Sequence, residues 1–136
     1  MGRLNTFAPI VLSIARLIIG LIFMEHGTQK LLGFPASDHA FGMFSLPWFA
    51  GIVELACGAL IAVGFMTRPA AFLASGTMAV AYFVAHAPNS FFPVNNGGDA
   101  AILYCFFFLY LVFAGPGPIS IDRILGHDPH PPKTRI

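Results

Sequence analysis

With 136 residues, the chain is long enough for one domain, but its composition departs from that of soluble globular proteins. Hydrophobic residues make up 57% of the sequence and charged residues only 10%, and the mean hydropathy is +0.77. These values predict an integral membrane protein. The net charge of +1, with lysines and arginines scattered singly, argues against nucleic acid as a partner.

Four apolar runs separated by turn residues predict four membrane-spanning helices. The spans are predicted at residues 8–32, 47–66, 69–87 and 99–114, and residues 119–136 are predicted to form an interfacial or frayed tail. Pro9 and Pro47 suit the first turn of a helix, whereas Gly33 and Gly115 follow the last. The short turn at Thr67–Pro69 predicts that spans two and three form a helical hairpin. We therefore predict a single all-α membrane domain over residues 1–136, a polytopic four-helix bundle with interfacial loops.

The distribution of cations predicts the orientation of the bundle. Asp38 and Asp99 lie on the other side of the membrane from most cations and are accompanied there only by Lys30. Cations are enriched in cytoplasmic loops, so the sequence predicts that both termini are cytoplasmic and both long loops are outside. The cations on the predicted cytoplasmic side are Arg3, Arg68, Arg123, Lys133 and Arg135.

Polar residues from different spans are predicted to lie at similar depths in the outer half of the bundle. Glu54 lies seven residues after Pro47, about 10 Å into the membrane, level with His26. Ionisable groups in hydrocarbon cost at least about 2–3 kcal/mol and usually mark a site or a pair. Lys30, Tyr82, His86 and Tyr104 fall within the same outer half.

Glycines predict how the first two spans pack. At 100° per residue, Gly20 and Gly27 lie on the same face of span one, and Gly51 and Gly58 flank Glu54 on span two. Packing these faces together brings Glu54 toward His26 and Lys30. The alternative interpretation is a purely structural polar network that holds the helices together.

Arg16 stands alone in the inner half of span one. Its position fits three interpretations: an ion pair or carbonyl cap that fixes helix register, a ligand-binding residue, or a group that binds a lipid phosphate.

The sequence contains no metal, haem-attachment or nucleotide-binding signature. Cys57 and Cys105 both lie in apolar spans without a CxxC spacing, which favours buried structural thiols over a redox pair.

Several motifs, in order along the chain, resemble the DoxX family of small bacterial membrane proteins. They cover about Leu12 to Asp122 and comprise Arg16, Gly20 and Phe23, then HGTQKL at residues 26–31, Glu54, Gly58 and Gly64 with Thr67 and Arg68, NNGGD at 95–99, and GPGPISID at 115–122. The resemblance implies a four-helix protein of the bacterial inner membrane, because family members are described as subunits of thiosulfate:quinone oxidoreductase or terminal quinol oxidase systems.

The resemblance therefore implies a quinone or quinol as the ligand. In this hypothesis, His26 or Lys30 hydrogen-bonds a ring carbonyl and Glu54 exchanges the proton. The further candidates for binding the cofactor are Arg16, Tyr82, His86 and Tyr104.

The expected partners are membrane lipid and another membrane or peripheral oxidoreductase subunit, or further copies of the chain. Whether the chain is itself an enzyme is left open, with a subunit of a quinone-dependent oxidoreductase as the expectation. The alternatives are a non-catalytic scaffold that docks another membrane protein and, less supported, a small-solute transporter.

The predicted orientation can be tested with a reporter fused after Ile136, which we expect to read as cytoplasmic because the cations gather on that side. An extracellular reading in the unmodified protein would show that the orientation is inverted.

Overall fold

The computed structural model describes residues 2–128, and this part of the chain is built from helices joined by irregular segments. The helices are α1 (Gly2–Asn5), α2 (Ala8–Leu32), α3 (Leu46–Val63), α4 (Thr67–Ala81), the π-helical turn η1 (Tyr82–His86), α5 (Pro93–Asn96), α6 (Asp99–Ala114) and α7 (Ile121–Ile124). The predicted all-α membrane bundle is confirmed. Of the predicted tail, residues 129–136 lie outside the described part.

Three of the helical segments are long and apolar enough to cross a bilayer: α2, α3, and α4 continued by η1. Helix α6 has 16 residues and is about 24 Å long, less than the roughly 30 Å of a typical hydrocarbon core. Exposed Phe91, Phe92 and Val94 precede it and extend the apolar surface at that end.

The helix boundaries follow the turn chemistry of the sequence, with two corrections: the second span, predicted to end at residue 66, ends at Val63, and the third begins at Thr67. Helix α2 has the predicted limits and ends at Gly33, whose φ of 67° suits glycine. Helix α3 ends before Gly64, which also has a positive φ, of 70°. The predicted turn at Thr67–Pro69 is instead the first turn of α4, where a proline is tolerated because the amide it lacks would have no helical partner.

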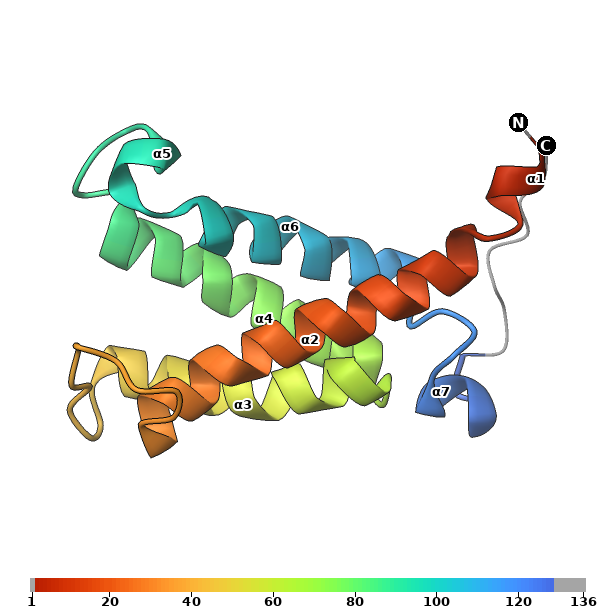
Figure 1. The fold of residues 1–136 in the computed structure, drawn as a ribbon, viewed down its shortest axis with the longest axis horizontal. Coiled ribbons are helices and arrows are strands. Elements are labelled where there is room, and N and C mark those ends of the chain that lie inside the picture. The colour runs from red at the N-terminus through yellow and green to blue at the C-terminus, as the bar shows by residue number, and fades with distance from the viewer. Residues whose placement is uncertain (1, 129–136) are drawn as a thin grey trace.

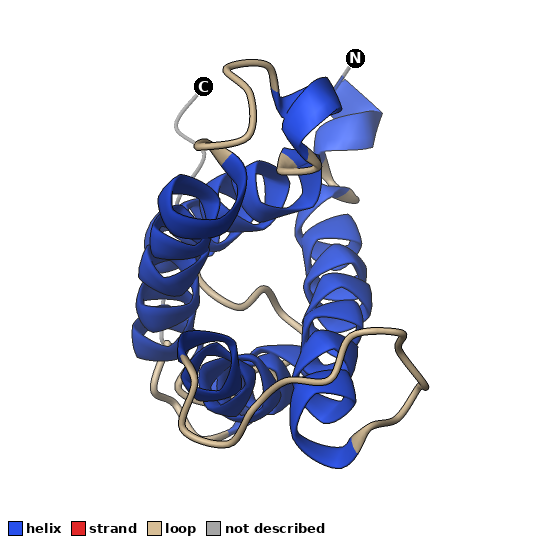
Figure 2. Ribbon diagram, turned by 90° about the vertical axis from the view of Figure 1, so that its left-hand side faces the viewer, coloured by secondary structure: helices blue, strands red, loops and turns tan. Residues whose placement is uncertain are grey.

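The helices form two pairs. Helix α2 packs along α3, α4 packs along α6, and the α3–α4 hairpin joins the pairs as predicted. Figure 1 shows α1 and α7 at one end and α5 at the other, with the two pairs diverging toward α5. Following the predicted orientation, we call these the inner end and the outer end. Figure 2 views the bundle from the outer end, where the chain between α2 and α3 lies in front.

The packed core lies where the pairs meet. Phe23 of α2, Ile61 of α3, and Phe108 and Leu111 of α6 are completely buried. Helix α4 contributes small side chains to the same cluster, including Ala71 and Ala74. These alanines let the neighbouring helices approach closely, as small residues do in membrane bundles.

The predicted glycine contact between the first two spans is confirmed. A Cβ atom on Gly20 would lie 2.7 Å from the backbone nitrogen of Ala62, and one on Gly58 would lie 2.7 Å from that of Met24. Neither backbone can yield without separating the helices. The glycines therefore set the spacing of α2 and α3.

We expect Gly58→Ala to destabilise the bundle, because the added methyl group meets backbone rather than a flexible side chain. Overpacking of this kind typically costs about 1–3 kcal/mol, which thermal unfolding in nanodiscs measures. Gly76→Ala is the matched control: nothing lies within 4 Å of its Cβ position, and alanine is the better helix former. Equal stability of both variants would contradict this account.

Candidate functional site

An ion pair between Lys30 and Glu54 joins α2 to α3 in the outer half of the bundle. The Lys30 Nζ lies 2.6 Å from the Glu54 Oε1, and the two side chains are 20% and 3% exposed. The predicted approach of these two residues is confirmed. Lys30 lies in the last turn of α2, from which its flexible stem reaches back to the carboxylate.

The second carboxylate oxygen of Glu54 has no hydrogen-bond partner. The Oε2 atom is buried, and within residues 2–128 no donor reaches it. Buried polar atoms are nearly always paired, because desolvation without a hydrogen bond costs several kcal/mol by most estimates. Glu54 therefore retains a buried acceptor that the described part of the chain does not satisfy.

His26 does not join this pair, contrary to the prediction. Its ring faces Tyr104 of α6 edge-on, with ring centroids 5.9 Å apart, and its side chain is exposed. Four residues separate His26 from Lys30, which places them as neighbours on α2, but the helix is rotated so that His26 points toward α6.

Tyr104 belongs to a group of aromatic rings that bridges α2 and α6. The Phe23 ring lies 5.2 Å from that of Tyr104 and 4.7 Å from that of Phe108, measured between centroids. Tyr104 and Phe108 stack at 5.7 Å. These rings form an apolar wall on the opposite side of the bundle interior from the α3–α4 hairpin.

Tyr82 and His86 lie on η1, at the outer end of the other helix pair, so they share the predicted depth but contact a different set of residues. Asn96 of α5 contacts both residues. Its side-chain amide nitrogen donates to the Tyr82 hydroxyl at 3.3 Å, and its backbone carbonyl accepts from the His86 Nδ1 at 3.1 Å. Because a carbonyl only accepts, the His86 Nδ1 is the donor in this hydrogen bond. The role of Asn96 was missed by sequence reasoning.

Arg16 lies near the inner end, apart from the other predicted site residues. Its Nε donates to the Pro116 carbonyl at 2.7 Å, and its Nη1 donates to the Ile61 and Ala62 carbonyls at 2.6 and 2.7 Å. Its Nη2 donates to the Ile119 carbonyl. Among the interpretations of Arg16, the carbonyl cap is the one that these contacts match.

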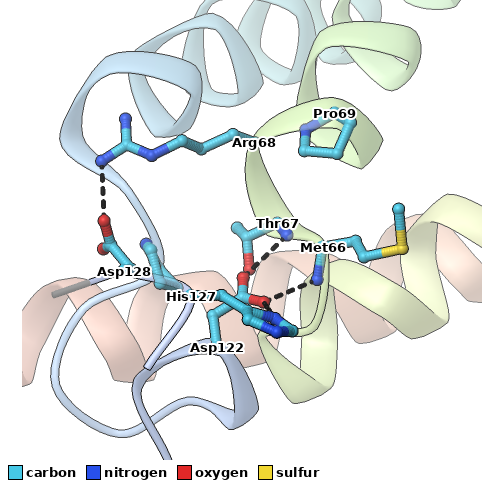
Figure 3. A pocket seen from close by; sticks show the side chains of 8 residues that line it. Met66, Thr67, Arg68, Pro69, Asp122, His127 and Asp128 are labelled. Atoms are coloured by element: carbon cyan, nitrogen blue, oxygen red, sulfur yellow. Dashed lines mark hydrogen bonds and ion pairs between the residues drawn. The ribbon is translucent and has the colours of Figure 1, made fainter. Parts of the chain in front are cut away.

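Asp122 also lies near the inner end, and sequence reasoning assigned it no role. Figure 3 shows its carboxylate below the start of α4, where its two oxygens accept from the Met66 and Thr67 amides, both at 2.9 Å. Burial would raise the pKa of Asp122, but the hydrogen bonds from the Thr67 and Met66 amides and the nearby His127 outweigh burial and lower it.

Arg68 completes this inner-end network. It donates to the Val112 and Phe113 carbonyls at the end of α6 and forms an ion pair of 3.1 Å with Asp128. Arg68, Asp122 and Asp128 line a hollow of about 210 Å³ (Figure 3).

The DoxX family model matches residues 11–87. The chain belongs to the DoxX family. The predicted resemblance to that family is therefore confirmed. The matched region covers the first three predicted spans and includes the residues of the α2–α3 contact.

The chain is also similar to individual bacterial proteins. The chain is 40% identical to an uncharacterized protein of Haemophilus influenzae, over 90% of this chain and 96% of the relative. It is 31% identical to the inner membrane protein YphA of Escherichia coli, over 85% and 90% of the two chains, and 28% identical to the inner membrane protein YqjF of the same organism, over 82% and 89%. No solved structure matches the chain significantly.

The lowered pKa of Asp122 predicts how stability depends on pH. Because the unfolded chain binds the proton more tightly, the carboxylate stabilises the fold above its ordinary pKa of about 3.9, and this contribution is lost as the pH falls through the lower pKa of the folded state. Asp122→Asn also places an amide donor against an amide, and we expect it to cost about 1–2 kcal/mol at neutral pH.

Unfolding measured between pH 3 and 7 checks this expectation, with exposed Asp38→Asn as the control. The wild type should lose stability on acidification more steeply than Asp122→Asn. Parallel pH profiles for these two proteins would refute the assigned capping role.

Proposed function

We propose that the chain is a multi-pass protein of the bacterial inner membrane that binds a quinone or quinol ring beside the Lys30–Glu54 pair. The observation that carries the proposal is the buried Oε2 of Glu54, which has no donor within residues 2–128. Relatives named as inner membrane proteins support the location.

The residues at this position fit a ring that bears oxygen atoms. The Lys30 ammonium has three donors, and only one bond, to Glu54, is formed within the described residues. Its remaining donors suit a ring carbonyl, and the free Glu54 oxygen suits a ring hydroxyl. The half-buried Tyr104 offers an aromatic ring on the α6 side.

In this proposal the chain contributes ring binding and proton exchange, and electrons are exchanged with a partner subunit of a respiratory or sulfur-linked oxidoreductase. When bound, the quinone supplies the redox chemistry. Glu54 holds or releases the accompanying proton, and Lys30 stabilises its ionised form. A carboxylate paired at one oxygen and free at the other suits that exchange.

A second candidate function is a non-catalytic scaffold that docks another membrane protein. The same ion pair favours it, because Lys30 and Glu54 connect two helices and such a pair serves packing as well as chemistry. The two functions differ in what the loss of the pair changes.

We expect Glu54→Gln to remain folded but to bind a short-chain benzoquinone about tenfold more weakly or worse, measured by equilibrium dialysis in nanodiscs. The amide cannot exchange a proton and presents a donor where the carboxylate presents an acceptor. Glu25→Gln is the matched control, because Glu25 is an exposed carboxylate on the same helix as Lys30.

The double variant Lys30→Met, Glu54→Leu separates the two functions. Replacing a buried ion pair with apolar side chains is often neutral or stabilising, so we expect unchanged or higher unfolding temperature and lost quinone binding. Unchanged quinone affinity in Glu54→Gln would defeat the proposal. A wild type that binds no quinone but loses a co-purifying subunit in the double variant would favour the scaffold.

A further inference from the structure

Helices α2 and α6 face each other without close backbone packing. Among the neighbouring pairs of long helices, α2–α3, α3–α4 and α4–α6 pack closely, whereas the backbones of α2 and α6 hardly approach one another. The space between them is bridged by side chains: Phe23 and His26 of α2 meet Tyr104 and Phe108 of α6. We call this set of four residues the α2–α6 seam.

His26 is the polar side chain that α2 contributes to this seam. It lies six residues before the end of α2, about 9 Å along the helix. Its imidazole is exposed, and the hydrogen bonds and ion pairs of residues 2–128 do not include it. Hydrocarbon offers no hydrogen bonds, so an imidazole at this depth requires a polar group from outside the described chain.

The seam borders lipid. Ile22 lies one turn before His26 on α2, Leu103 lies next to Tyr104 on α6, and their side chains are 44% and 71% exposed. Such apolar side chains on a membrane helix face acyl chains. A ligand dissolved in the bilayer therefore reaches His26 without crossing a headgroup layer or a packed helix interface.

We propose that a membrane-dissolved ring binds from the lipid side at the outer edge of the α2–α6 seam, where the exposed His26 hydrogen-bonds one of its oxygen atoms. This inference rests on the proposed function, but its evidence is separate from Glu54. His26 and Lys30 are adjacent on one face of α2, so a ring oxygen held at Lys30 leaves the ring beside His26 and Tyr104. The α2–α6 seam therefore suits a planar lipophilic ring that has oxygen atoms at two edges. An apolar tail attached to such a ring remains in the lipid.

Tryptophan fluorescence tests the location. In a Trp48→Phe background, which removes the chain's single tryptophan, Tyr104→Trp places a reporter in the seam and Phe106→Trp places one on the lipid-facing side of the same helix, at a residue that is 66% exposed. Decyl-benzoquinone added to nanodiscs should quench the first reporter saturably and the second only in proportion to its concentration in lipid.

His26 variants test the contact. His26→Leu should bind decyl-benzoquinone about tenfold more weakly without a lower unfolding temperature, because leucine is more compatible with lipid than imidazole is. His26→Gln should recover part of the affinity, since its amide still forms a hydrogen bond.

The possible failures are distinguishable. Saturable binding by the wild type with equal quenching of both reporters, or unchanged affinity in His26→Leu, would overturn the seam and leave the proposed function standing. An absence of saturable binding to the wild type would overturn both.

Discussion

The interaction on which the rest of the bundle depends is the burial of the Arg16 guanidinium among backbone carbonyls. The last carbonyls of a helix have no partners within it, and neither lipid nor an apolar neighbour can supply them. Arg16 donates to two such carbonyls at the end of α3 and to two more, of Pro116 and Ile119, in the segment after α6. One buried cation thus fixes three parts of the chain, and the carbonyls offset the cost of burying it.

The same solution recurs at the other helix ends nearby. Arg68 caps the carbonyls that end α6, and Asp122 caps the amides that begin α4. Helix ends at the inner end are therefore tied together by charged groups that bond to backbone. The outer end is joined by fewer bonds of this kind, and the helix pairs diverge toward it (Figure 1). Closure at one end leaves the outer half as the region where side chains such as His26 remain unpartnered.

Much of the fold could be predicted because hydropathy and turn residues act locally. The limits of α2 followed from its apolar run and from Pro9 and Gly33 at its ends. The contact between the glycine faces and the meeting of Lys30 with Glu54 followed from the 3.6-residue period and from depth. The partners of Arg16 and Asp122 could not be predicted, because backbone groups 45 to 103 residues away have no sequence signature. His26 was predicted to lie beside Glu54, but its ring faces Tyr104. The depth of a residue in the membrane and its angle around the helix axis describe one helix at a time, and they do not specify which neighbouring helix each side will face.

Polar residues that look alike in the sequence differ in how many hydrogen bonds they form in the structure. Arg16 and Glu54 are buried and bear the cost of leaving water, whereas His26 is exposed on the side of the helix. Arg16 uses four of the five guanidinium donors on carbonyls, so its requirement is met by the fold. Glu54 has one oxygen paired and one unpaired within the described chain, and His26 has neither nitrogen engaged there. Of these three groups, only Glu54 is both shielded from water and left with an unpaired atom by the described residues. The Thr67 hydroxyl near the inner end is also buried without a partner, but a carboxylate oxygen bears a larger desolvation cost than a hydroxyl, and Glu54 is for that reason the group at which we propose that an outside ligand bonds.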